Sequence, residues 1–492
     1  MKVLYACAEL FPLLKTGGLA DVSAALPPAL LAEGCDVRLV MPAFPAILDG
    51  TQRRKPVAAL PAGPVAPAAQ VLRGQFKGNG LTVYLVDAPA LFERPGNPYL
   101  DASGREWPDS AQRFALLGWA AASLGFGLDP AWTPDVVHCH DWHTGLAPAY
   151  VRAQAQARRL AGPASVFTVH NLAYQGVFDS AMYALLGLPP AMFGIEGVEF
   201  HGQVSFMKAG LQFADRITTV SPTYAREILS PEQGWGLDGV LRARSSVLSG
   251  ILNGVDYAVW SPQADALLAQ PYDHDRMAGK AQAKAQLQQR LGLDATPDAL
   301  VFGVVSRLTE QKGLHLVPPV LDELVARGGQ LAVLGAGDAG IEQALRAAAN
   351  RHPGRVALHV GYDESLAHTV VAGSDVIMVP SLFEPCGLTQ LYGLRYGTLP
   401  LVRGVGGLAD TVTDSTLENL HDGSATGFVF HDFNARGLQA AVWRAFALRA
   451  RPADWAAVQQ RGMEQRFDWQ VAAQAYGALY RDLRPSTRTV HR

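Results

Sequence analysis

Cysteine is scarce in this sequence. Only Cys7, Cys35, Cys139 and Cys386 occur among the 492 residues, and no two of them form a CxxC pair. Such sparse and irregular spacing argues against a disulfide framework. The cysteines therefore predict a protein of the reducing cytoplasm.

Excess charge and long apolar runs are also missing. The formal net charge is −3 and 17% of the residues are charged, which gives no electrostatic reason to expect nucleic acid or an anionic membrane as a partner. No apolar run approaches the roughly 18 residues of a membrane span. Glu9 and Lys15 interrupt the first apolar stretch too early for a signal peptide. We expect partners that are small, neutral or locally recognised.

Short apolar runs that alternate with amphipathic stretches dominate the sequence. The length of 492 residues and the apolar content of 49% predict two or three domains with ample cores. The alternation predicts an α/β protein with two doubly wound parallel sheets. The predicted strands cover residues 3–8, 37–41, 81–86, 134–140, 165–170, 216–220, 300–305, 330–334, 356–360, 376–380 and 399–402.

Breaks in this alternation predict the domain boundaries. They give a first domain over 1–248, a linker over 249–262, a second domain over 263–467 and a C-terminal helical segment over 468–492. The Ala-, Pro- and Gly-rich stretch 56–67 predicts a surface loop. Doubly wound sheets bind ligands outside the carboxyl ends of their strands. If the two domains face each other, the polar residues that follow their strands converge on one cleft.

One such candidate is the turn over residues 15–22, between a predicted strand and a predicted helix. Gly17 and Gly18 let the backbone approach a ligand, the free N–H groups of the helix start favour an anion, and Lys15 adds a positive charge. The same Gly-Gly-Leu-Ala-Asp motif recurs at residues 406–410. We therefore predict two similar turns, one in each domain, that face one ligand.

Further polar clusters follow strands in both domains. Arg307 and Lys312 lie at a predicted loop-to-helix start, where cations are unfavourable unless an anion joins them, and both could reach one diphosphate. Glu384 lies in a turn pinned by Pro385 and Gly387, where a carboxylate could accept sugar hydroxyls or stabilise developing positive charge. In the first domain, a predicted strand ends at His170, and a single histidine in such a place is more often structural than catalytic unless the site is located independently.

Other patterns have ordinary structural explanations that we prefer. Residues 335–340 match GxGxxG, but they follow the second strand of their domain and lack a well-placed acid, so we favour a tight turn over a dinucleotide site. Residues 138–143 suggest a metal cluster, but no second ligand cluster follows, so we favour a polar strand end that lines a site. Residues 273–275 are similar to a DxD motif, but no strand precedes them, and we expect a solvated loop. Cys386 has no arranged base that would make it a nucleophile.

Taken in order, seven motifs resemble bacterial glycogen synthase and plant starch synthase. They cover residues 15–22, 140–143, 168–176, 253–256, 306–313, 384–389 and 406–412, and the resemblance extends from residue 1 to about 480. It implies the GT-B fold, with two Rossmann-like domains facing across a deep cleft and a C-terminal helix that crosses back to the first domain. It also implies retaining transfer of glucose from ADP-glucose to the non-reducing-end 4-hydroxyl of an α-1,4-glucan such as glycogen, with release of ADP.

The resemblance also implies roles for individual residues. Glu384, His170 and Lys15 are the implied catalytic residues, and the implied substrate-binding residues are Lys15, Gly17, Gly18, Asp21, Asp141, His143, Asn253, Arg307, Lys312, Tyr362, Cys386, Gly387, Thr389, Gly406 and Gly407. Among them, Arg307 and Lys312 would neutralise the leaving diphosphate and Tyr362 would contact the adenine. Many retaining GT-B enzymes carry a second acid eight positions after the first; here that position is Tyr392, so we assign no second catalytic carboxylate.

The mechanism expected from these residues needs no metal cofactor. No second nucleophile stands out, so we expect attack on the face that ADP leaves, with the departing phosphate taking the acceptor proton. The sequence does not decide between ADP-glucose and UDP-glucose. Two alternatives from other classes are an NAD-linked oxidoreductase, which rests on residues 335–340 alone, and a non-catalytic glucan-binding module, which rests on the nine tryptophans.

Overall fold

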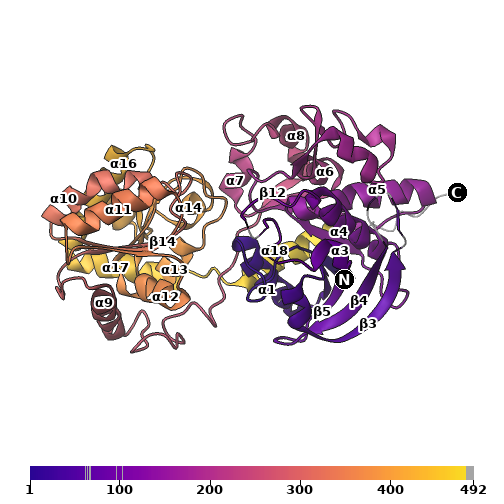
Figure 1. The fold of residues 1–492 in the computed structure, drawn as a ribbon. Helices are drawn as coiled ribbons and strands as arrows, with labels where there is room; N and C mark the ends of the chain where they lie inside the picture. The colour runs from indigo at the N-terminus through magenta and orange to yellow at the C-terminus, as the bar shows by residue number, and fades with distance from the viewer. Residues whose placement is uncertain (61, 64, 66–67, 96, 102, 484–492) are drawn as a thin grey trace. The chain divides into compact units, whose positions relative to one another are not determined.

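The protein consists of two structural units. The computed structural model describes residues 1–483 except 61, 64, 66, 67, 96 and 102. Contacts group Met1–Gly254 with Trp469–Arg492 as the first unit and Val255–Asp468 as the second (Figure 1). The division falls inside the predicted linker 249–262. Among the described residues, no helix combines the length and the apolar character needed to cross a bilayer.

The first unit is built on a nine-stranded sheet with the order β12-β11-β7-β6-β1-β2-β5-β4-β3. The strands from β12 to β5 all run parallel, and their apolar residues form one buried core with the surrounding helices. Each strand predicted for the first domain is present. These strands are β1 (Lys2–Ala6), β2 (Asp36–Pro42), β5 (Thr82–Asp87), β6 (Val136–His140), β7 (Ala164–Val169) and β11 (Arg216–Thr219), to which the structure adds β12 (Leu248–Gly250).

An antiparallel hairpin at one edge of this sheet contradicts part of the prediction. Residues 56–60, predicted as loop, belong to β3 (Thr51–Leu60), which pairs with β4 (Ala69–Phe76), a strand that was not predicted. Residues 61, 64, 66 and 67 of the predicted loop lie outside the described residues. The sheet accommodates Pro56 because β3 is its edge strand, where a residue without an N–H group removes no hydrogen bond between inner strands. The pairing of β3 with β4 is also irregular on both sides of Pro56. The alanine-rich composition concealed the strand because it lacks the usual β-branched alternation.

Helices cover the sheet, and the C-terminal helix packs on the N-terminal one. Helix α1 (Gly18–Ala32) buries Leu19, Val22, Leu26 and Leu30, and it contacts α18 (Trp469–Asp482), as Figure 1 shows. The remaining helices of this unit are α2 (Pro45–Asp49), α3 (Pro89–Phe92), α4 (Ser110–Gly125), α5 (Leu146–Arg158), α6 (Phe206–Phe213), α7 (Pro222–Glu227) and α8 (Asp238–Ala243). A small sheet of β8 (Val177–Phe178), β10 (Gln203–Ser205) and β9 (Glu199–Phe200) follows the strand β7.

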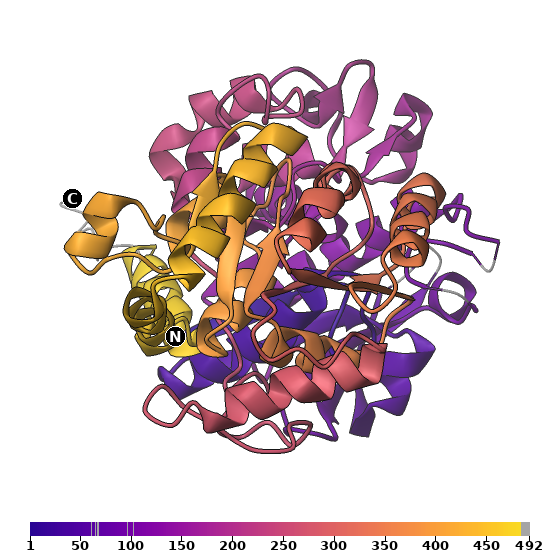
Figure 2. The ribbon, with the colours of Figure 1, turned by 90° about the vertical axis from the view of Figure 1, so that its left-hand side faces the viewer.

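The second unit contains a six-stranded sheet in which every pair is parallel, with the order β15-β14-β13-β16-β17-β18. Its strands are β13 (Val301–Val305), β14 (Gln330–Gly335), β15 (Val356–Val360), β16 (Val376–Val379), β17 (Leu399–Arg403) and β18 (Phe428–Phe430), the last of which was not predicted. Helices lie on both faces (Figures 1 and 2): α10 (Leu321–Ala326), α11 (Ala339–Arg351) and α16 (Ala435–Arg449) on one, and α9 (Ala278–Leu291), α12 (Glu364–Gly373), α13 (Thr389–Arg395) and α17 (Pro452–Glu464) on the other. Two shorter helices, α14 (Gly406–Thr411) and α15 (Leu417–His421), follow β17.

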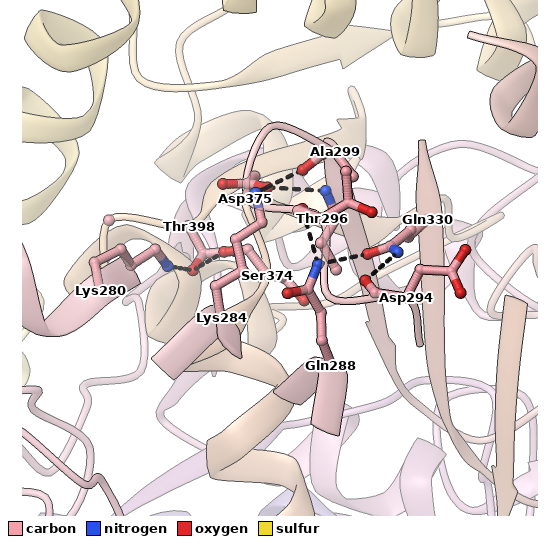
Figure 3. Close-up of polar contacts among 12 residues, drawn as sticks. Lys280, Lys284, Gln288, Asp294, Thr296, Ala299, Gln330, Ser374, Asp375 and Thr398 are labelled. Carbon is pink, nitrogen blue, oxygen red and sulfur yellow. Dashed lines mark hydrogen bonds and ion pairs between the residues drawn. The ribbon is translucent and has the colours of Figure 1, made fainter. Parts of the chain in front are cut away.

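Side chains of helix α9 contact the edge at which strands of this sheet begin (Figure 3). Lys280, Lys284 and Gln288 recur every four residues and therefore share one face of the helix. Lys284 Nζ lies 2.7 Å from the carboxylate of Asp375, which directly precedes β16, and Lys280 donates to the hydroxyl of Thr398, which directly precedes β17. These contacts of α9 provide partners for the polar side chains of Asp375 and Thr398, which precede two strands of the sheet.

The buried amine of Lys280 predicts a dependence of stability on pH. Burial lowers the pKa of Lys280 to about 7, although the negative charge of Asp375 partly offsets this effect. Between pH 7 and the ordinary lysine range, the unfolded chain binds a proton that the folded chain does not, so folding stability rises with pH there, by at most about 1.4 kcal/mol per pH unit. We expect Lys280→Met to remove this rise. Urea unfolding at pH 7.5, 8.5 and 9.5 measures it, with Lys77→Met, at an exposed lysine, as the control. Parallel curves for the wild type and Lys280→Met would contradict the assignment.

Candidate active site

The turn at Lys15 lies between β1 and α1, as predicted. Lys15 Nζ forms an ion pair with Asp21 Oδ1 at 2.9 Å. A Cβ atom added to Gly17 or Gly18 would meet no protein atom within 4 Å. The two glycines therefore relieve no clash within the protein; they leave open space in front of α1, which suits a turn that faces a ligand.

A buried carboxylate that the sequence analysis missed holds this turn. Glu9 is 3% exposed, and its Oε2 accepts hydrogen bonds from the backbone N–H groups of Thr16 at 2.7 Å and Gly17 at 3.2 Å. These two N–H groups are therefore not available to an anion, which narrows the predicted anion site to the N–H groups from Gly18 onward. An acid shortly before a glycine turn is the signal that could have identified Glu9.

Tyr99 links the Lys15 turn to a second cluster in the first unit. Its hydroxyl donates a hydrogen bond to Glu9 Oε1 at 2.5 Å, and its ring stacks on that of His143 with 4.8 Å between the centroids. Burial, reinforced by the charge of Glu9, raises the pKa of Tyr99 well above its usual range, so the phenol keeps its proton. Tyr99 thereby connects Glu9, which holds the Lys15 turn, with His143, which lies far away in the sequence.

Asp141, His143 and His170 gather beyond the ends of β6 and β7. Asp141 Oδ1 accepts a hydrogen bond from the backbone N–H of His170 at 2.7 Å, and Asp141 adopts a φ of +56°, which is uncommon for a residue other than glycine. Such strained backbone tends to cluster at active sites. Burial raises the pKa of Asp141 to about 7 and lowers the pKa values of His143 and His170 to about 3, so both imidazoles are neutral at pH 7.

His138 and His140, considered above as metal ligands, bond to other side chains of the first unit. The Nδ1 and Nε2 atoms of His138 lie 2.7 Å from the hydroxyls of Tyr480 and Thr168, and His140 Nδ1 lies 2.9 Å from His170 Nε2. Among the residues that the structure describes, no group of three or more His, Cys, Asp and Glu side chains is placed to hold a metal ion. The cluster attaches α18 to β6 and orients His170.

In the second unit, Lys312 and Glu384 meet beyond the carboxyl ends of the neighbouring strands β13 and β16. Lys312 Nζ lies 2.5 Å from Glu384 Oε2, and the Ser381 hydroxyl donates to the same oxygen at 2.9 Å. Glu384 is 6% exposed, whereas Arg307 is exposed and reaches the Gln311 side chain at 3.4 Å. The site therefore offers a buried, paired carboxylate and a solvent-facing guanidinium.

The loop that carries these cations depends on Gly313. Its φ is +68°, and a Cβ atom there would lie 1.9 Å from the carbonyl oxygen of Pro380, so only glycine lets the loop approach the end of β16. The helix predicted to start after Lys312 is instead a short 3₁₀ turn, Leu314–Leu316. The proline pair 318–319 explains the difference by its position, because these residues lack the N–H groups that would donate to the carbonyl oxygens of Leu314 and His315 in the first turn of such a helix.

The second Gly-Gly-Leu-Ala-Asp turn differs from the first. The N–H of Gly407 donates to the carbonyl oxygen of Glu384 at 3.1 Å, and a Cβ atom on Gly407 would lie 2.1 Å from the carbonyl oxygen of Cys386. These glycines let α14 pack directly on the turn that holds Glu384. The two turns therefore differ in packing: the first leaves open space around its glycines, whereas the glycines of the second serve close packing. That both turns face one ligand stays a prediction.

The other predicted residues also lie at the ends of elements. Tyr362 follows β15 and is 72% exposed, a suitable position for a flat ring to stack on a base. Asn253 is half-buried after β12, Cys386 is buried in the Glu384 turn, and Thr389 begins α13. Gly387 lies between them with a φ of +71°.

The GxGxxG segment is a tight turn, as preferred above. Asp338 accepts hydrogen bonds from the N–H groups of Gly340 and Ile341 at 2.9 and 3.0 Å, and it caps α11. The helix N-terminus that would bind a dinucleotide pyrophosphate thus already holds a carboxylate. Asp273 forms an ion pair with the exposed Arg276 at 2.8 Å within a loop, in line with the loop expected for residues 273–275.

A cavity of about 830 Å³ lies elsewhere, at the edge where strands of the first unit begin. Asp135, Ser165 and Arg216, at the starts of β6, β7 and β11, line it together with Tyr480 of α18. No predicted site residue lines this cavity. Sheets of this kind bind ligands at their carboxyl edge, so we place the active site at the opposite edge.

Comparisons with known proteins identify the family of this chain. Residues 2–243 match the family described as starch synthase catalytic domain, and residues 287–460 match glycosyl transferases group 1. The glycogen synthase of Albidiferax ferrireducens is 63% identical over 495 residues, which cover 99% of this chain and all of that protein. The glycogen synthase of Francisella tularensis subsp. novicida is 52% identical over 98% of this chain and 99% of its own.

Solved structures show the same fold. The catalytic domain of starch synthase IV from Arabidopsis thaliana, bound to ADP and acarbose, superposes with a TM-score of 0.86 at 30% identity over 98% of each chain. Sucrose-phosphate synthase from Thermosynechococcus elongatus, with a TM-score of 0.58 at 17% identity over 98% of each chain, shares the fold alone. The predicted GT-B fold and the resemblance drawn from the motifs are confirmed. The chain belongs to the glycogen synthase family of glycosyltransferases.

Proposed function

We propose that this protein transfers glucose, with retention, from ADP-glucose to the 4-hydroxyl at the non-reducing end of an α-1,4-glucan. The Lys312–Glu384 pair carries the proposal, because it places a cation beside a carboxylate. The cation suits the negative charge of the leaving diphosphate, and the carboxylate suits the positive charge that develops on the sugar. The ADP in the starch synthase IV structure supports adenine as the base, and the glycogen synthase relatives support the acceptor. The four free cysteines suit a reducing cytoplasm.

In the second unit, we assign donor binding to the residues that follow the strands. The exposed Arg307 presents a fork of donors and Lys312 a point charge to the diphosphate, while Glu384 accepts sugar hydroxyls and stabilises positive charge at the reacting carbon. Tyr362 stacks on the adenine. The turn that supports Glu384 is shaped by Cys386, Gly387, Thr389, Gly406 and Gly407.

In the first unit, we assign roles to both polar clusters. The open turn of Gly17 and Gly18, with Lys15 held by Asp21, contacts the donor's phosphate and glucose. His170, neutral and oriented by its backbone bond to Asp141, contacts the transferred glucose. His143 lines the acceptor side, and Asn253 contacts the phosphates or the glucose.

The reaction proceeds by attack on the face that ADP leaves. The bond between the anomeric carbon and the diphosphate oxygen breaks as the acceptor O4 bonds to the same face of that carbon. The acceptor proton passes to the departing β-phosphate, so no separate base is needed. Arg307 and Lys312 stabilise the charge of the leaving ADP, and Glu384 stabilises the positive charge on the sugar ring.

A comparison of two donors tests the proposal. The purified protein is incubated with glycogen and either ADP-glucose or UDP-glucose, and kcat/KM is measured from the release of nucleoside diphosphate. We expect ADP-glucose to be preferred at least about tenfold, the difference that 1.4 kcal/mol of discrimination gives. A preference for UDP-glucose would overturn the choice of donor, and no release from either donor would overturn the reaction.

Activity is expected without an added divalent cation. The two cations Arg307 and Lys312 match the charge that a diphosphate develops on leaving, and the phosphate itself accepts the proton. Turnover measured after extensive treatment with EDTA should equal turnover with added Mg²⁺. Loss of turnover in chelator, restored by Mg²⁺ or Mn²⁺, would contradict this expectation.

Replacement of Lys15 by alanine should weaken use of the donor. Hydrogen bonds to charged groups contribute roughly 1.5–3 kcal/mol, so kcat/KM for ADP-glucose is expected to fall about 10- to 100-fold, with little change in KM for glycogen. Lys2→Ala, at an exposed lysine on β1 of the same unit, is the control. Kinetics of Lys15→Ala within twofold of the wild type would refute the role of this turn.

A further inference from the structure

Trp260 forms the centre of a stack of rings in the second unit. Its ring centroid lies 3.7 Å from that of His368 with an angle of 17° between the planes, and 4.0 Å from that of Tyr392 with an angle of 3°. Two rings stacked this closely on one face would overlap each other, so His368 and Tyr392 occupy opposite faces of the indole. The indole ring of Trp260 therefore packs between a side chain of α12, His368, and a side chain of α13, Tyr392.

A buried carboxylate five residues later holds the same two helices. Asp265 Oδ2 lies 2.7 Å from His368 Nδ1 and accepts a hydrogen bond from the hydroxyl of Tyr396, which caps α13, also at 2.7 Å. Burial lowers the pKa of His368, but the bonds to Asp265 and Glu364 outweigh it and raise the pKa to about 9. The imidazole is thus charged at pH 7 and attracted to the face of the indole.

The helices held in this way begin next to two parts of the proposed donor site. Helix α12 begins two residues after Tyr362, whose hydroxyl contacts Glu364 in its first turn. Helix α13 begins at the end of the Glu384 turn, and Gln390 in its first turn donates to the carbonyl oxygens of Cys386 and Gly387 at 3.0 Å. The distance between the two helix starts thus sets the distance between these two parts of the site.

We propose that Trp260 is a positioning residue that spaces α12 from α13 and thereby sets Tyr362 at the correct separation from the Glu384 turn for a nucleotide sugar. This inference rests on the proposed function. The flat ring of Tyr392 completes the stack on Trp260. A carboxylate there could not stack in this way.

Substitution of Trp260 tests the proposal, with Trp455 as a matched control. Trp455 is 3% exposed and packs on Phe428 in the core of the same unit, but it contacts neither α12 nor α13 through a ring stack. Wild type, Trp260→Leu, Trp260→Phe and Trp455→Leu are compared by calorimetry with ADP, by KM for donor and for glycogen, and by urea unfolding.

We expect Trp260→Leu to raise the Kd for ADP and the KM for the donor about tenfold or more, because small displacements of binding groups are costly, and to leave the KM for glycogen within twofold. Trp260→Phe should restore most of the affinity, since a ring still fills the stack. Trp455→Leu should lose comparable stability without a change in ADP affinity. If Trp260→Leu does not fold, Tyr392→Leu takes its place, with the same expectation.

Three outcomes would overturn the proposal: unchanged ADP affinity in Trp260→Leu, an equal rise in Trp455→Leu, or a phenylalanine variant as impaired as the leucine one. A wild-type protein that neither binds ADP nor releases it from ADP-glucose would instead overturn the proposed function. The two failures are therefore distinguishable.

Discussion

Replacement of Glu384 by glutamine is expected to lower kcat about 10²- to 10³-fold, the range seen when one electrostatic contribution to a transition state is removed. Glutamine has the shape of glutamate, and its carbonyl oxygen can still accept the hydrogen bond from Ser381. What it lacks is the negative charge that would stabilise the sugar ring as ADP departs. Because this charge matters most in the transition state, the KM for the donor should change much less than kcat.

Steady-state kinetics with ADP-glucose and glycogen measure this effect. Glu310→Gln is a suitable control, because it removes an exposed carboxylate from the loop that also carries Lys312. Its kcat should stay within twofold of the wild type. A Glu384→Gln variant that turns over at nearly the wild-type rate would show that Glu384 has no role in the chemical step.

The sequence predicted the parallel strands well because their signal is local. Buried parallel strands are short apolar runs, and the polar residues that follow them lie at one edge of the sheet whatever the details of packing. Lys312 and Glu384 were therefore predicted as neighbours of one ligand, although their 2.5 Å ion pair was not. The edge hairpin of β3 and β4 was missed because alanine and proline conceal an edge strand.

Residues that act through long-range contacts left no comparable signal. Glu9 is one acid in an apolar stretch, and only the fold shows that it holds the Lys15 turn and bonds to Tyr99. Trp260 lies in a segment predicted as linker, and its stack with His368 and Tyr392 depends on two helices more than 100 residues away. Such contacts follow from tertiary packing, which no local pattern encodes.

The two Gly-Gly-Leu-Ala-Asp turns show how one short motif can serve two purposes. Around Gly17 the space is open, whereas Gly407 lies against the backbone of Cys386. The local sequence determines the strand-to-helix turn in both places. Whether the glycines face a ligand or a neighbouring backbone depends on what the rest of the unit packs against them.

Removal of Lys312 is expected to be as damaging as removal of Glu384, for two reasons that act together. Lys312→Met deletes a cation that we assign to the leaving diphosphate, and it leaves the buried carboxylate of Glu384 without its ion-pair partner. We expect kcat/KM for ADP-glucose to fall about 10³-fold. Arg307→Lys, which keeps the charge of an exposed group but loses the fork, should cost only about tenfold.

The double variant Lys312→Met/Glu384→Gln separates the two reasons. If the pair acts as a unit, its kcat/KM should resemble that of the worse single variant, because the second substitution removes a group already made ineffective by the first. The double variant should also be at least as stable to urea as Lys312→Met, since neutral glutamine no longer buries an unpaired charge. Additive losses in the double variant would mean that Lys312 and Glu384 act independently, and that their ion pair does not contribute to the transition state.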